Sequence, residues 1–80
     1  MNKRNEVNRR THAEVVINEL EVIDDLVLTR IKKAEFSITE LESLGRGDLA
    51  APVRSEVMGL RHVSGLILAR IKAINEGGIV

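Results

Sequence analysis

The chain has 80 residues, 44% of them hydrophobic, and its 12 lysines and arginines balance 12 aspartates and glutamates. This length gives one domain, and the apolar fraction is too high for intrinsic disorder. A zero net charge gives no overall attraction to nucleic acid or to an anionic membrane, and the absence of cysteine excludes disulfides and thiolate metal sites.

Residues 1–10 form a basic segment, which we interpret as a frayed arm that keeps the protein solvated. No uncharged apolar run follows it, so it is not a secretory signal, and no run approaches the length of a membrane span. We therefore expect a cytoplasmic protein that does not contact a membrane. An alternative is that the arm binds phosphates of nucleic acid. The cations of this alternative surface are Lys3, Arg4, Arg9, Arg10, Arg54 and Arg61.

The first helix is predicted over about residues 11–44. Thr11 and Glu14 fit a capping box, in which each side chain accepts from the other residue's amide. Apolar residues then recur every three or four positions. Ser37 and Glu40 form a second capping-box match that offers a break near Phe36, but we favour one continuous helix. The apolar stripe consists of Val16, Leu20, Ile23, Val27, Ile31, Ala34, Ile38 and Leu41.

A turn over residues 45–48 and a second helix over about 49–76 follow. Gly45 fits a left-handed helix stop, Asp48 fits a cap, and Pro52 fits a first helical turn. Gly77 and Gly78 end the helix and leave a short tail over residues 77–80. The stripe of this helix consists of Val53, Val57, Leu60, Val63, Ile67, Ile71 and Ile74.

The sequence of residues 25–32, DLVLTRIK, recurs forty positions later as GLILARIK over residues 65–72. Two copies of an amphipathic helix joined by a short turn predict an all-α antiparallel hairpin. Because two helices cannot enclose both stripes, we expect a homodimeric four-helix bundle, the alternative being that another protein covers them. The predicted self-association residues are Val16, Leu20, Ile23, Val27, Ile31, Val57, Leu60, Val63, Ile67 and Ile71.

Charge differs between the two helices. Residues 11–44 hold eight acidic and three basic residues, whereas residues 49–76 hold four basic and two acidic ones. An acidic helix beside a basic one favours pairing in a fixed register, although exposed ion pairs add only about 0–1 kcal/mol each.

A second apolar group lies off the main stripe of the first helix, beside a row of acids. It is either a wider buried face in a bundle or a docking surface for a partner. In the second case the acids would imitate phosphates in a basic cleft of that partner. The predicted partner-binding residues are Val15, Val22, Leu26 and Phe36, with Glu14, Glu21 and Asp25.

No arrangement of residues indicates catalysis, a metal or a cofactor. His12 and His62 lack ligands at metal spacing on their own helix faces, and Asp24 beside Asp25 is interpreted as solvated charge. The serines at 37, 43, 55 and 64 are interpreted as cap, linker and helix-surface residues without a base. We therefore expect a non-enzymatic protein without a small-molecule substrate, which acts as an inhibitor, adaptor or regulator by binding a macromolecular partner.

Overall fold

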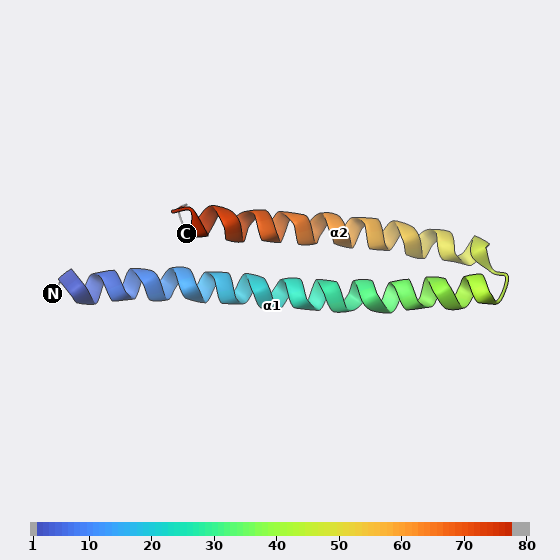
Figure 1. The fold of residues 1–80 in the computed structure, drawn as a ribbon, viewed down its shortest axis with the longest axis horizontal. Coiled ribbons are helices and arrows are strands. Elements are labelled where there is room, and N and C mark those ends of the chain that lie inside the picture. Colours follow the sequence, from blue (N-terminus) through green and yellow to red (C-terminus); the bar gives the residue numbers. More distant parts are fainter. Residues whose placement is uncertain (1, 78–80) are drawn as a thin grey trace.

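A computed structural model describes the backbone of residues 2–77 and the side chains of residues 12–77. This part of the chain forms two helices, α1 (Asn2–Ser43) and α2 (Gly47–Asn75), which pack antiparallel side by side (Figure 1). The molecule is a rod of 66 × 15 × 12 Å. The predicted all-α helical hairpin is confirmed.

Helix α1 is continuous, as predicted, but it begins at Asn2 rather than near Thr11. The segment before Thr11 contains neither glycine nor proline, so nothing in it stops the helix from extending toward the amino terminus. Near Phe36 the hydroxyl of Ser37 donates to the backbone carbonyl of Lys33 at 3.1 Å, as a serine does inside a helix. The second capping-box match is therefore not a helix start.

The connection between the helices is a glycine-based turn. The amide of Gly45 donates to the carbonyl of Glu42 at 3.0 Å, and that of Arg46 donates to the carbonyl of Leu41 at 2.8 Å. Gly45 has a φ of +72°, which supplies the left-handed residue that this pair of hydrogen bonds requires. The predicted helix stop at Gly45 is confirmed.

Helix α2 begins at Gly47, so the prediction that Asp48 caps it from outside was wrong. Asp48 lies in the first turn, and Arg46, the residue at the cap position, makes no side-chain capping bond. Arg46 instead donates to both carboxylate oxygens of Asp48 at 3.3 Å. This guanidinium holds the pKa of Asp48 below its ordinary value, and both side chains are exposed.

The two helices meet along a seam in which buried and half-buried residues alternate at spacings of three and four. This is the heptad pattern of an antiparallel coiled coil. The seam residues of α1 are Ala13, Ile17, Leu20, Asp24, Val27, Ile31, Ala34, Ile38 and Leu41. Those of α2 are Ala50, Val53, Val57, Leu60, Ser64, Ile67, Ile71 and Ile74.

The best-buried part of the seam is centred on Ile31, Ala34 and Val57. Toward the turn, Ala50 has no exposed surface at all. Alanine at positions 34 and 50 removes bulk between the helices, which lets their backbones approach near the turn. The buried hydrophobic residues of the seam thus lie mostly in its turn-proximal half, with Ile74 as the exception.

The seam differs from the predicted stripes at two levels. At the first, Ile17 takes the seam position predicted for Val16, although both side chains are half-buried. At the second, the predicted residues are exposed. Ile23 and Val63, expected inside, are 48% and 41% exposed, whereas Asp24 and Ser64 are only 6% and 7% exposed. Either 23 or 24 fits between Leu20 and Val27 at helical spacing. The strict alternation of four and three from residue 27 onward selects position 24, because the seam of a coiled coil keeps a 3.5-residue period. The prediction chose Ile23 and Val63 because they are apolar, and it was therefore wrong at this level.

Candidate interaction surfaces

Ion pairs line both flanks of the seam. Glu42 and Glu35 of α1 meet Arg54 and Arg61 of α2, with nitrogen–oxygen distances of 3.0 and 2.7 Å. On the opposite flank, Arg30 of α1 meets Glu56 of α2 at 2.8 Å. These pairs confirm that the acidic helix lies against the basic one. All six side chains are 38–60% exposed, so the pairs set the register more than they stabilise the fold.

The ion pairs also involve two residues of the alternative nucleic-acid-binding surface. Arg54 and Arg61 are each occupied by a carboxylate of α1. A phosphate would have to displace that carboxylate, so these arginines do not form a free cationic surface.

A polar contact crosses the seam at the residues that directly precede the two repeated segments, 25–32 and 65–72. The Ser64 hydroxyl donates to Oδ1 of Asp24 at 2.6 Å, and both residues are buried. The expectation that Asp24 is solvated and that Ser64 lies on the helix surface was therefore wrong. Asp24 and Ser64 are forty residues apart, so they occupy the same position in the two copies of the repeat, and these equivalent positions face each other across the seam. Such a contact fixes one alignment of the helices, because any slip buries an unpaired carboxylate.

The predicted acidic stripe lies on α1 toward its amino-terminal half. Glu14, Glu21 and Asp25 are all exposed. Glu14 and Glu21 occupy the same heptad position as Glu35 and Glu42, but among the described residues no ion pair involves them or Asp25. These three carboxylates therefore remain available to an outside partner.

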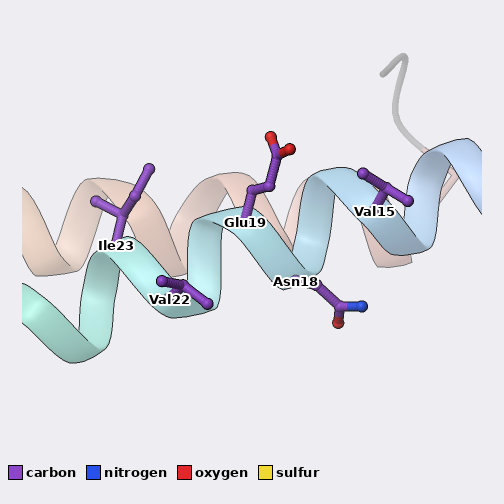
Figure 2. A pocket seen from close by; sticks show the side chains of 5 residues that line it. All are labelled: Val15, Asn18, Glu19, Val22 and Ile23. Carbon is purple, nitrogen blue, oxygen red and sulfur yellow. The ribbon is translucent and has the colours of Figure 1, made fainter.

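The predicted apolar contacts are exposed on the outer side of α1. Val15, Val22 and Phe36 are 46%, 59% and 65% exposed. Val15, Val22 and Ile23, with Asn18 and Glu19, line an open depression of about 470 Å³ formed by α1 alone (Figure 2). Figure 2 shows the Glu19 carboxylate projecting between Val15 and Ile23. The depression is shallow and apolar, which suits a protein side chain better than a small molecule.

A larger apolar surface, here called the open face, covers one flank of the hairpin around the repeat. The Arg30–Glu56 ion pair marks this flank, and Ile23 and Val63 lie one heptad away from it on the two helices. Leu26 and Leu66 extend it outward, at 67% and 59% exposed. The open face consists of Leu20, Ile23, Leu26 and Val27 of α1 with Leu60, Val63, Leu66 and Ile67 of α2.

Sequence reasoning missed Leu66 as a surface residue of interest. Leu66 falls outside the stripe of α2, and its repeat equivalent Leu26 was assigned to a separate patch of α1. Comparing the two copies of the repeat position by position would have paired Leu26 with Leu66.

The remaining polar candidates show no constellation in the part of the chain that the structure describes. His12 and His62 are exposed and lie far apart in the sequence, and no group of three or more potential metal ligands occurs among residues 12–77. Ser43 donates to the carbonyl of Thr39 at 2.9 Å, within its own helix. Among the described residues, neither helix has a stretch long and apolar enough to cross a membrane.

The cations of the amino-terminal arm lie on a helical backbone. Residues 2–10 are the first turns of α1, which extends past the end of α2 (Figure 1). The side chains of Lys3, Arg4, Arg9 and Arg10 lie outside the described residues.

The chain matches no protein-family model, and comparisons with curated proteins and with solved structures gave no match. The surfaces above are therefore interpreted from their own geometry and chemistry.

Proposed function

We propose that this hairpin is a non-enzymatic interaction module that acts as a homodimer and binds a macromolecular partner as an inhibitor, adaptor or regulator. The observation that supports this proposal is the surface of α1, where three acids without ion-pair partners lie beside exposed Val15 and Val22. Large aliphatic side chains exposed next to one sign of charge are typical of a surface that meets another protein.

The acidic stripe holds its carboxylates at fixed separations along one helix. Glu14 and Glu21 are separated by about 10 Å along the helix axis, and Glu21 and Asp25 by about 6 Å. A rigid helix that carries carboxylates at this spacing presents them without an ordering cost, which favours association with a basic cleft. We therefore propose that the partner has a cationic surface, such as a nucleic-acid-binding cleft.

Dimerisation is the second element of the proposal. The predicted self-association residues Leu20, Val27, Leu60 and Ile67 are only half-buried within one hairpin. A second hairpin would complete their burial, as in a four-helix bundle.

Charge reversal tests the partner surface. The double substitution Glu21→Lys/Asp25→Lys is expected to weaken binding of protein partners captured from a native lysate by at least about tenfold, because two attractive charges become repulsive. The circular-dichroism spectrum and the sedimentation mass should not change, since both side chains are exposed.

The matched control is Asp48→Lys/Glu76→Lys, which makes the same change in net charge at exposed positions near the two ends of α2. Capture should survive in this control. If the Glu21/Asp25 variant still retains its partners at native affinity, the acidic stripe is not the binding surface.

A second candidate function is nucleic-acid binding through the amino-terminal arm. The observation in its favour is that α1 extends past α2, so that an arm with four cations projects beyond the hairpin (Figure 1). Deletion of residues 1–10 is then expected to abolish a gel shift of DNA or RNA that weakens as salt rises. The absence of any shift for the full chain at low salt would reject this function.

A further inference from the structure

We infer that the open face is the contact surface for a second copy of this chain. The two copies pack antiparallel about a two-fold axis that lies between them at the level of Leu26. In this arrangement Glu19 of each copy lies against Lys33 of the other. The inference rests on the proposed homodimer and specifies its face and its register.

Exposure within the hairpin points to this flank. Leu26, Ile23 and Val63 are 67%, 48% and 41% exposed, although they are aliphatic and adjacent in space. Beside them, the seam residues Leu20 and Val27 are only half-buried, whereas Ile31, at the other seam position, is 5% exposed. The apolar residues thus form a second seam along the same helix, which is how a helix contacts two neighbours in a four-helix bundle.

The internal repeat gives both helices the same apolar residues on this face. Every open-face position of α1 has an aliphatic equivalent forty residues later: Leu20 and Leu60, Ile23 and Val63, Leu26 and Leu66, Val27 and Ile67. On the opposite flank the repeat keeps one exposed aliphatic pair, Leu28 and Leu68, but changes charge beside it, since Glu14 and Glu21 correspond to Arg54 and Arg61. The repeat therefore keeps four positions apolar on the open face of both helices, against one on the opposite flank, which favours the open face as the surface that packs against its own copy.

Charge on the row that contains Leu26 selects the register. Glu19 lies seven residues before Leu26 and Lys33 seven residues after it, so both share its side of the helix. Within the described residues, neither Glu19 nor Lys33 takes part in an ion pair. Antiparallel packing centred on Leu26 places each glutamate opposite a lysine of the other copy. It also places His12 opposite Glu40, because both are fourteen residues from the centre.

Neighbouring registers are unfavourable. An axis through residue 19 would set Glu19 against itself, and an axis through residue 33 would set Lys33 against itself. Like charges that face each other across an antiparallel contact repel. Of these three axes, only the one through the level of Leu26 sets opposite charges against each other, and it also places the apolar residues at the centre of the contact.

Helix α2 fits the same axis. The ion pairs Glu35–Arg61 and Arg30–Glu56 align the helices so that Leu66 is within about 2 Å of the level of Leu26 along the rod. Seven residues to either side of Leu66 lie Gly59 and Ala73, which are small and uncharged. A Cβ at Gly59 would meet nothing within 4 Å in the hairpin, so this position is open to a second chain.

The size of the face agrees with a stable contact. With the axis at the level of Leu26, the described side chains of α1 overlap those of the second copy over residues 12–40, and α2 overlaps its copy over residues 57–75, which are roughly 43 and 28 Å of helix. With each helix roughly 10 Å wide, the shared face measures about 700 Å² per copy, close to the roughly 800 Å² that one partner buries in a standard interface. Glu14 and Glu21 lie on the opposite flank of each hairpin, so the proposed dimer leaves the acidic stripe exposed on its outer sides.

Charge reversal and its restoration test the register. In sedimentation equilibrium, Glu19→Lys or Lys33→Glu alone is expected to raise the dimer dissociation constant by about tenfold, because two attractive contacts become repulsive. The double variant Glu19→Lys/Lys33→Glu should return to within about twofold of the native value. Lys32→Glu, an exposed reversal on the other side of α1, serves as the matched control and should leave the constant unchanged.

Engineered thiols test the direction of packing, since the native chain has no cysteine. A mixture of Glu19→Cys and Lys33→Cys chains should cross-link with a short bismaleimide, whereas each variant alone should give little covalent dimer. Cross-linking of Glu19→Cys chains to themselves would overturn the antiparallel register.

The outcomes separate this inference from the proposed function. A native chain that stays monomeric at all concentrations would overturn dimerisation and this inference together. A native dimer whose affinity is unaffected by either single reversal would overturn the open-face register alone, and leave the homodimer itself standing. The binding of captured partners by the acidic stripe is measured independently of both.

Discussion

Replacing Ile31 by alanine is expected to lower the free energy of unfolding by about 2–4 kcal/mol, which is among the largest losses expected from truncating any one of the described residues. Ile31 is 5% exposed and belongs to the buried cluster with Ala34 and Val57. Its removal leaves a cavity that the small Ala34 beside it cannot fill. Because a domain of this size has little stability to lose, the variant should be substantially unfolded near room temperature.

The measurement is urea denaturation followed by helical circular dichroism, with native and variant chains at equal concentration. Met58→Ala is the matched control, because Met58 is 73% exposed and its truncation should cost less than about 0.5 kcal/mol. An Ile31→Ala variant as stable as the control would mean that the seam is not the core of the fold.

The hairpin was predictable because its signals are local. The three- and four-residue spacing of aliphatic residues identifies both helices, and Gly45 identifies the turn between them. The start of α1 was not predictable from Thr11, because a capping box competes with an upstream segment that contains no helix breaker. Helix boundaries depend on such small free-energy differences, whereas the existence of the helices does not.

The interaction surfaces were predictable only in part. Opposite charges on the two helices predicted their ion pairs, which the Arg61–Glu35 distance of 2.7 Å confirms. The division of the apolar residues between the seam and the surface was predicted incorrectly. Ile23 was expected in the seam, but Asp24 occupies that position. Spacing alone leaves both choices open at one level, and only the continuous 3.5-residue period along α1 decides between them.

Ser64→Ala is expected to destabilise the hairpin by about 1–3 kcal/mol, far more than serine truncation costs on a surface. The Ser64 hydroxyl donates at 2.6 Å to Asp24, whose side chain is buried between the helices. Alanine at 64 removes this donor and leaves a carboxylate oxygen without its partner in the seam. Ser55→Ala, at an exposed position of α2, is the matched control and should change stability by less than about 0.5 kcal/mol.

Removing both polar groups should have the opposite effect. Asp24→Leu/Ser64→Ala replaces a desolvated carboxylate by an aliphatic side chain at a seam position, so the double variant is expected to be about 1–4 kcal/mol more stable than the native chain. Ser64→Ala should therefore cost stability in the native background but little in the Asp24→Leu background, and a double-mutant cycle in urea denaturation measures this non-additivity between residues forty positions apart. Additive effects of the two substitutions would show that the Asp24–Ser64 hydrogen bond does not persist in solution. If the cycle shows coupling, the native chain gives up stability at this level in return for a single alignment of its helices, since a seam with leucine at 24 tolerates a slip that a buried carboxylate forbids.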